Sequence, residues 1–210
     1  MLYKFICIEG NIGVGKTSLA KRISKESNSR LILEKFSNNP FLPKFYKDPE
    51  KNAFPLEMFF MAERFQQLRE VSEKELFSDC TVSDYFFGKS KLFAQNNLID
   101  NELLLFYQFY DILLSSLPKP NLLVYLHAEI DYLQQNIKKR GRPFEQEITN
   151  EYLYNIQEKY LDYFREQNDF PVLVIDVTNI NFMQNKKLYQ KILSEIQKPY
   201  SLGNHQIVLR

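Results

Sequence analysis

A short loop near the start of the chain, GNIGVGKTS at positions 10–18, is the feature that most constrains the fold. It fits the spacing G-x-x-x-x-G-K-[ST] of a phosphate-binding loop, whose backbone amides surround phosphate groups. The apolar run YKFICIE at 3–9 precedes the loop, and the segment SLAKRISKE at 18–26, with helical spacing, follows it. A strand before and a helix after are the context that such a loop requires. The sequence therefore predicts a nucleoside triphosphate site on an α/β scaffold.

Each residue type in this loop has a physical role. Glycines let the backbone amides turn inward, Lys16 is expected to reach the β and γ phosphates of ATP, and the hydroxyl of Thr17 is expected to bind Mg²⁺. The predicted ATP-binding residues of the loop are Gly10, Asn11, Ile12, Gly13, Val14, Gly15, Lys16, Thr17 and Ser18.

Apolar runs and helical segments alternate along the rest of the chain. The predicted strands lie at 3–9, 31–34, 80–84, 121–127 and 171–177. The predicted helical segments lie near 16–28, 53–74, 99–117, 130–165 and 184–198. Near-continuous apolar strands are typical of a parallel sheet that is covered on both faces. We therefore expect an α/β three-layer fold, with a five-stranded parallel sheet flanked by helices, as one domain over 1–198 and a tail of unassigned role at 199–210.

Composition excludes several function classes. The 210 residues are 44% hydrophobic, enough for the core of one domain without disulfides. Lys and Arg total 27 against 26 Asp and Glu, which argues against nucleic acid or an anionic membrane as a partner. Cys7 and Cys80 lie in predicted strands without metal-ligand spacing, as expected for buried, reduced thiols in a cytoplasmic protein. A first strand beginning at residue 3 leaves no room for a signal peptide, and no apolar run approaches a membrane span.

The phosphate acceptor is the open question for a protein with this loop. The chain has no N-K-x-D guanine-reading motif, and TVSD at 81–84 ends in one carboxylate, Asp84, rather than in a pair of acidic residues. Glu34 closes the second predicted strand and would lie beside the phosphate loop if the first two strands are near each other. A carboxylate there suits a hydroxyl acceptor, which must lose its proton during transfer. A solvated strand end is the alternative interpretation of Glu34.

Several ordered motifs together resemble the deoxynucleoside kinases, the family that includes deoxycytidine, deoxyguanosine and bacterial deoxyadenosine kinases. The matching segments are IEGNIGVGKTS at 8–18, LE at 33–34, FYKDPEKNAFPLE at 45–57, RF at 64–65, LFA at 92–94 and KKRGRPFEQ at 138–146. They extend over most of the chain, from residue 3 to about residue 182.

The resemblance implies roles for individual residues. Glu34 matches the base that accepts the proton of the sugar 5′-hydroxyl group, and Tyr46 and Glu145 match the pair that holds the 3′-hydroxyl group. KKRGR resembles the basic lid over the triphosphate, which would contribute Lys139, Arg140 and Arg142. The alternatives for this segment are an ordinary solvated helix end or a localisation-type basic cluster. The implied catalytic residues are Glu34, Lys16 and Arg140.

The helical segment that contains Glu57 and Arg64 is predicted to bind the nucleobase. Glu57 and Arg64 are two helical turns apart, so both project from one helix face with Met61 between them. Spacing alone leaves open a surface face that carries unrelated charges. The family uses this helix to bind the base, and Phe93 resembles the residue that stacks on it.

The chain departs from the family pattern at two places. Glu57 stands where most of these kinases have glutamine, and an ionised glutamate only accepts hydrogen bonds, which suits the two adjacent donors of guanine. Tyr85 follows Asp84 where the family has an arginine. Asp84 can still serve Mg²⁺ together with Thr17, and Lys89 can partly replace the missing charge.

The resemblance therefore implies ATP-dependent and Mg²⁺-dependent phosphorylation of the 5′-hydroxyl group of a deoxyribonucleoside in nucleotide salvage, with deoxyguanosine or deoxyadenosine favoured. A thymidylate-kinase-like nucleoside monophosphate kinase and a nonenzymatic nucleotide-binding regulator are the alternatives. The resemblance also implies a homodimer packed through helices. The segment ELLLFYQFYDILL at 102–114 could supply that face, or could equally be buried core.

Overall fold

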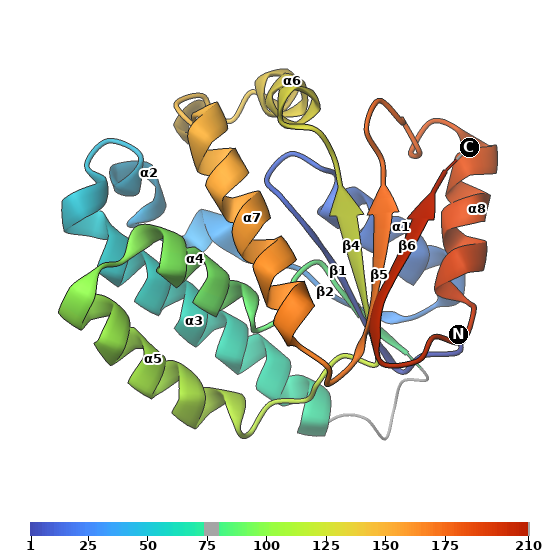
Figure 1. The fold of residues 1–210 in the computed structure, drawn as a ribbon, viewed down its shortest axis with the longest axis horizontal. Helices are drawn as coiled ribbons and strands as arrows, with labels where there is room; N and C mark the ends of the chain where they lie inside the picture. Colours follow the sequence, from blue (N-terminus) through green and yellow to red (C-terminus); the bar gives the residue numbers. More distant parts are fainter. Residues whose placement is uncertain (74–79, 210) are drawn as a thin grey trace.

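The computed structural model describes residues 1–73 and 80–209. Its centre is a six-stranded sheet of order β2-β3-β1-β4-β5-β6, in which neighbouring strands are parallel (Figure 1). The strands are β1 (Phe5–Gly10), β2 (Arg30–Ile32), β3 (Thr81–Ser83), β4 (Leu122–His127), β5 (Pro171–Asp176) and β6 (Gly203–Val208). The predicted α/β class is confirmed.

The predicted number of five strands is wrong, because residues assigned to a tail form β6. This strand pairs with β5 from Pro171↔Gly203 to Asp176↔Val208. β6 lies at the sheet edge, and its residues alternate between half-buried and exposed, whereas all six residues of β1 are buried. An edge strand therefore lacks the continuous apolar run that marks the central strands.

Eight helices and two short 3₁₀ turns are present in the described part of the chain. They are α1 (Lys16–Ser27), η1 (Phe36–Asn38), α2 (Leu42–Phe45), α3 (Pro49–Glu73), α4 (Lys89–Asn97), α5 (Asp100–Leu114), α6 (Ile130–Arg140), η2 (Pro143–Glu145), α7 (Asn150–Glu166) and α8 (Lys186–Ile196). One hydrophobic cluster packs α3, α4, α5 and α7 against one sheet face, and a second packs α1 and α8 against the other (Figure 1). Among the described helices, none is both long and apolar enough to cross a membrane.

Two predicted helical segments differ from the structure. The segment 130–165 is not continuous, because α6 ends at Gly141 with a left-handed φ of 69° and Pro143 begins η2 before α7 starts. The segment 53–74 begins earlier, at Pro49, and its last residue lies outside the described residues. α4 was not predicted, because its buried face includes the polar side chains Lys89 and Ser90 rather than an apolar stripe.

The strand order decides which loops meet at the site. β3 lies between β1 and β2, so the second strand is not a direct neighbour of the strand that leads into the phosphate loop. β2 ends at Ile32, and Glu34 lies in the loop beyond it rather than at the strand end. Cys7 lies in β1 as predicted, whereas Cys80 immediately precedes β3, and both are buried free thiols.

Candidate active site

The phosphate loop joins β1 to α1 at the carboxyl edge of the sheet. Gly13 has a φ of 88°, and a Cβ there would lie 2.8 Å from the carbonyl oxygen of Leu133, so a larger residue would strain the loop. Lys16 Nζ donates to the carbonyl oxygens of Gly10 at 2.8 Å and Asn11 at 3.0 Å. Burial, followed by the charge of Lys89, lowers the pKa of Lys16 to about 8. Two backbone carbonyl groups of the loop thus hold the amino group of Lys16 in place.

Two cavities lie side by side over this edge and share Gly13, Lys16, Thr17 and the two arginines at the end of α6 and just beyond it. The first has a volume of about 110 Å³ and extends from the phosphate loop to α3 and α7. The predicted residues that line it are Ile12, Gly13, Lys16, Thr17, Glu34, Tyr46, Glu57, Arg64, Asp84, Phe93, Arg140, Arg142 and Glu145. The second, of about 300 Å³, is lined by Gly13, Gly15, Lys16, Thr17, Ser18, Asn136, Arg140 and Arg142.

Some predicted residues lie outside these cavities. Met61 is 1% exposed and belongs to the core cluster, so of the trio predicted on α3 only Glu57 and Arg64 line the first cavity. Val14 is buried in the core beneath the loop, and Lys139 is exposed at the end of α6. Asn11 is also buried, and its side chain donates to the carbonyl oxygen of Leu153 at 2.7 Å, which anchors the loop to α7.

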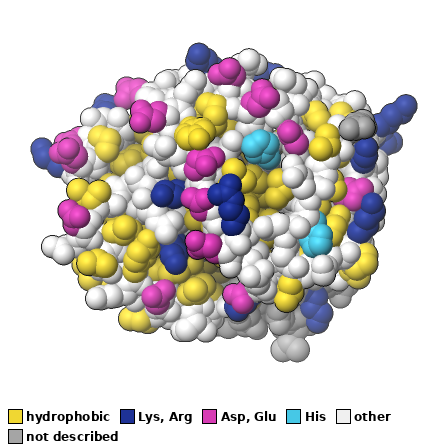
Figure 2. Space-filling view, in the orientation of Figure 1, with side chains coloured by type: hydrophobic (Ala, Val, Ile, Leu, Met, Phe, Trp, Pro, Cys, Tyr) yellow, Lys and Arg dark blue, Asp and Glu magenta, His cyan; other side chains and the backbone are white. Residues whose placement is uncertain are grey.

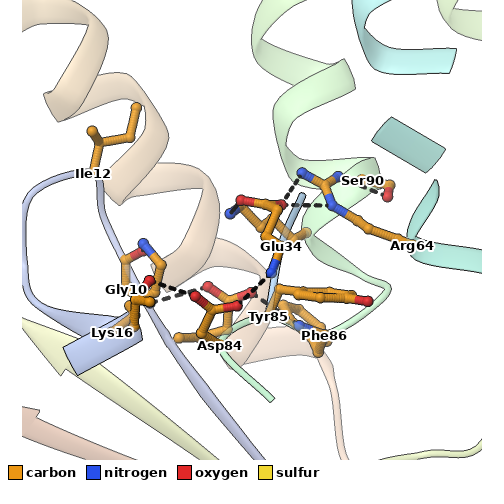
Figure 3. A network of polar contacts seen from close by, with 12 residues as sticks. Gly10, Ile12, Lys16, Glu34, Arg64, Asp84, Tyr85, Phe86 and Ser90 are labelled. Atoms are coloured by element: carbon orange, nitrogen blue, oxygen red, sulfur yellow. Dashed lines mark hydrogen bonds and ion pairs between the residues drawn. The ribbon is translucent and has the colours of Figure 1, made fainter. Parts of the chain in front are cut away.

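Glu34 lies between two cations on the floor of the first cavity. Arg64 donates to its Oε1 at 2.9 Å from Nε and at 2.7 Å from Nη2, and Lys89 Nζ contacts Oε2 at 2.7 Å. Figure 3 shows Glu34 and Arg64 pointing toward each other, with Ser90 bonded to the far side of the guanidinium group at 2.9 Å. Burial acts to raise the pKa of Glu34, but the charges of Lys89 and Arg64 outweigh it and hold that pKa far below its usual range.

Asp84 connects the loop after β2 to the phosphate loop. One carboxylate oxygen accepts a hydrogen bond from the hydroxyl group of Thr17, and the other accepts from the backbone N–H of Glu34 at 2.8 Å. These two contacts bring Glu34 to the site even though β3 separates β2 from β1. They also place the two predicted magnesium ligands, Thr17 and Asp84, in direct contact.

Tyr85, which occupies the family's arginine position, faces the interior. Its side chain is fully buried, and its hydroxyl group donates to Gln67 at 2.7 Å. Tyr85 is therefore not a substitute for an arginine in the cavity. A cation four residues further along the chain, Lys89, does line the cavity, where it contacts Glu34 and lies 5.4 Å from the ring centroid of Phe93.

Glu57, on α3, is another buried carboxylate that lines the first cavity. It is 1% exposed, and its Oε1 accepts a hydrogen bond from Asn97 Nδ2 at 2.7 Å. Its Oε2 is buried and has no partner among the described residues. Burial raises the pKa of Glu57 to about 7, an effect that the charge of Arg64 partly offsets.

Aromatic and basic residues close the opposite wall. Tyr46 stacks with Phe144 at 6.5 Å between ring centroids and meets Tyr152 edge-on. Glu145 is 5% exposed and pairs with both arginines of the predicted lid, Arg140 and Arg142, the latter at 3.0 Å. Glu145, one of the predicted sugar-binding pair, is therefore joined to the two lid arginines by ion pairs.

Among the residues that sequence reasoning missed are two polar ones next to this site. Glu9 is fully buried, and its carboxylate accepts hydrogen bonds from the backbone N–H groups of Gly10 and Phe86 and from the hydroxyl group of Tyr160. Burial raises its pKa. An acid within an otherwise apolar strand was the signal that could have identified it. Asn97 was the other, and nothing in its local sequence pointed to Glu57.

Comparison with known proteins identifies this constellation. The deoxynucleoside kinase family model matches residues 6–200. The chain belongs to the deoxynucleoside kinase family. The match extends over nearly the whole chain, and this protein is a phosphotransferase.

Individual relatives agree with this assignment. The kinase is 35% identical over 199 residues to deoxyguanosine kinase of Bacillus subtilis, with 92% of this chain and 96% of the relative covered. It is 28% identical to deoxyadenosine kinase of Lactobacillus acidophilus, with 97% and 100% covered. The solved structure of deoxyadenosine kinase from M. mycoides with bound dATP has the same fold, with a TM-score of 0.79, 23% identity, and 93% and 100% of the two chains covered.

Proposed function

We propose that this kinase transfers the γ-phosphoryl group of ATP to the 5′-hydroxyl group of a purine deoxyribonucleoside in nucleotide salvage. The observation that carries the proposal is the position of Glu34, which lines a cavity shared with Lys16 and Thr17 of the phosphate loop. A hydroxyl acceptor needs a carboxylate within hydrogen-bond reach, whereas an acceptor phosphate is already ionised. The paired cations keep that carboxylate charged.

The reaction depends mainly on positioning. The phosphate-loop amides and Lys16 would hold the β and γ phosphates, and Arg140 and Arg142 would balance the charge that spreads over the transferred group. The 5′-oxygen forms a bond to the γ-phosphorus as the bond to the β–γ bridging oxygen breaks and ADP leaves. The hydroxyl proton passes to Glu34.

Glu34 can accept this proton while its ion pairs stay in place. A carboxylate has about four lone-pair sites, and the contacts from Arg64 and Lys89 occupy only some of them. The pKa of Glu34, lowered by the charges of Lys89 and Arg64, keeps this carboxylate ionised at neutral pH. As the 5′-oxygen bonds to the γ-phosphorus it loses electron density, and its proton becomes more acidic. A weak base such as Glu34 can therefore accept that proton.

The residues present fit a magnesium ion. Mg²⁺ prefers oxygen ligands and usually binds through one or two carboxylates together with substrate phosphates. Thr17 and Asp84 offer a hydroxyl group and a carboxylate in mutual contact, close to the phosphate loop. When bound with ATP, the ion would neutralise phosphate charge. Asp84 would keep its second role, since its other oxygen holds the backbone of Glu34.

The wall opposite Glu34 suits a deoxyribose. Tyr46 and Glu145 both line the first cavity, and we assign them to the sugar 3′-hydroxyl group. The ring of Tyr46 would also crowd the space that a ribose 2′-hydroxyl group needs. Because Glu145 is paired with Arg140 and Arg142, sugar binding and lid position are coupled.

The base end of the cavity favours guanine. An ionised Glu57 presents only acceptors, and guanine alone among the nucleobases offers two adjacent donors, N1–H and the 2-amino group. The unpartnered Oε2 of Glu57 supports this assignment, because a buried carboxylate oxygen without a donor is costly. Phe93 would stack on the base, as the half-buried ring lines the same cavity.

We further propose a cytoplasmic homodimer that packs through α5. Leu104 is 60% exposed and Ile112 is 69% exposed on this helix, and Leu105 and Phe109 beside them are also exposed. Figure 2 shows hydrophobic side chains gathered at the lower left, over the region of α5, while charges of both signs are mixed across the rest of this face. A second copy would cover this apolar patch.

One substrate panel tests the function. The purified kinase is given labelled ATP with each of the four deoxynucleosides, guanosine and dTMP, and product formation is measured. We expect deoxyguanosine to be phosphorylated best and guanosine poorly. A preference for thymidine would end the purine assignment, and a preference for dTMP would end the assignment of a nucleoside acceptor.

A further inference from the structure

Asn97 is a polar contact of the base-reading carboxylate that comes from a different helix. It is the last residue of α4 and is half-buried, while Glu57 lies on α3. Its Nδ2 donates to Glu57 Oε1 at 2.7 Å and reaches the hydroxyl oxygen of Tyr152 at 3.3 Å. Asn97 lines an outer cavity on the far side of Tyr152 and is not among the residues that line the first cavity. It would therefore act on a bound base through the cavity residues that it contacts, of which Glu57 is the nearer.

The adjacent residue, Asn96, determines the orientation of the Asn97 amide. Asn96 Nδ2 donates to Asn97 Oδ1 at 2.9 Å, so the carbonyl end of the Asn97 amide is already occupied. Rotating the amide would bring two donors together at Asn96 and remove the donor from Glu57. The group facing Glu57 is thus a donor, which stabilises the charged carboxylate and offers nothing to a protonated one.

The protonation state of Glu57 determines which base edge it matches. An ionised carboxylate accepts twice and fits the N1–H and 2-amino group of guanine. A protonated carboxyl group donates once and accepts once, like glutamine, and fits the N1 and 6-amino group of adenine. Protonation of Glu57 would therefore change the site from one that fits guanine to one that fits adenine.

Opposing influences act on Glu57 from every element packed around it. Burial raises its pKa to about 7, the charge of Arg64 and the hydrogen bond from Asn97 lower it, the charge of Glu34 raises it, and the charge of Lys89 lowers it. The titratable or charged groups that face it are Arg64 of α3, Glu34 after β2, Lys89 of α4, Tyr46 after α2 and Tyr152 of α7. Arg64 and Lys89 are both engaged with Glu34, which leaves Asn97 as the described residue whose side chain donates to Glu57.

We propose that Asn97 is a positioning residue for base specificity, which holds Glu57 ionised and oriented so that Oε2 is presented to guanine rather than adenine. This inference rests on the proposed deoxynucleoside kinase function and adds to it the residue that keeps the base reader in its guanine form. The unpartnered Oε2 is then the acceptor reserved for the base.

Two variants remove the donor in different ways. Asn97→Ala deletes it, and the nearly isosteric Asn97→Asp replaces it with an acceptor, with thermal melting used to verify that each variant is folded. For both, kcat/KM for deoxyguanosine and deoxyadenosine is measured from pH 6 to pH 9. We expect the rise of deoxyguanosine kcat/KM to move to higher pH, and the preference for deoxyguanosine at pH 7 to fall about tenfold or more. The shift should be larger in Asn97→Asp.

Controls separate this role from a structural one. In a Glu57→Gln background, Asn97→Ala should leave the pH profile of the base preference unchanged, because the titrating group is gone. Asn155→Ala, an exposed residue on the rim of the same outer cavity, should behave as wild type. A folded Asn97→Ala or Asn97→Asp enzyme with the wild-type preference and pH profile would overturn the proposal.

Calorimetric binding of each nucleoside, in two buffers that differ in ionisation heat, separates this proposal from the proposed activity. Binding of deoxyguanosine near pH 7 should release protons, and Asn97→Ala should increase that release. If this proton release is found but there is no turnover, the proposed function fails and the proposed role of Asn97 is supported. If there is turnover but neither protein releases protons, only the proposed role of Asn97 is overturned.

Discussion

Two carboxylates lie in one cavity and have opposite pKa shifts. Glu34 is held far below its usual pKa because Lys89 and Arg64 both contact it, whereas burial lifts the pKa of Glu57 to about 7. Glu34 has two cations within 3 Å, whereas Glu57 has one neutral amide. Neighbours, not residue type, set the charge of a buried acid. The difference suits one acid to proton acceptance and the other to base recognition.

Glu34→Gln should have the largest effect. The variant keeps the size of the side chain but removes the acceptor of the hydroxyl proton, so turnover of deoxyguanosine should fall about a thousandfold. ATP binding, measured by calorimetry, should change little because the phosphate loop is intact. Near-normal turnover would show that Glu34 is not the base. The opposite pKa shifts of Glu34 and Glu57 would then not correspond to different roles.

Lys89→Met should have the next largest effect. It removes one of the two cations on Glu34 while keeping most of the stem, so kcat should fall about a hundredfold. The pKa of Glu34 should rise toward its usual range, and kcat should become sensitive to acid. Lys89→Arg restores the charge and should recover part of the activity. Full activity in Lys89→Met would mean that Arg64 alone supplies the charge.

Glu57→Gln should change selectivity more than rate. Glutamine fits adenine, so the deoxyguanosine preference should fall about 10-fold to 100-fold in favour of deoxyadenosine. Wild-type kcat/KM for deoxyguanosine should rise with pH through about 7, since the ionised acid binds guanine, and this rise should vanish in the variant. Parallel pH profiles in the two proteins would contradict the assignment of Glu57 as the base reader.

The smallest effect concerns stability. Because the folded-state pKa of Glu57 lies above its unfolded value, the stability that Glu57 contributes is present below that unfolded value and is lost as pH rises through about 7. Glu57→Gln should therefore melt a few degrees above wild type at pH 8, and the difference should narrow toward pH 5. Glu34 has the opposite sign, since its stabilisation exists above its unfolded pKa and is lost in acid. Equal melting temperatures at pH 8 would show that ionisation of Glu57 does not destabilise the fold.

The sequence predicted the residues of this site better than their arrangement. The phosphate loop lies between β1 and α1 as its spacing requires, because its function depends on local backbone geometry. Glu34, Glu57 and Arg64 line one cavity as predicted. Lys89 was predicted to replace part of a missing charge, but its contact with Glu34 could not be read from the sequence. Met61 lies outside the cavity because helical spacing specifies a face and not its depth.

The sequence by itself determined the α/β class, the phosphate loop and the identities of the acids and cations, because these depend on residue type and short-range spacing. Only the tertiary structure decided that β3 separates β1 from β2, that 203–208 becomes an edge strand, and that Asn97 meets Glu57. The pKa shifts of Glu34 and Glu57 also belong to this second group. Each depends on burial and on charges from distant segments, which are set when the chain folds.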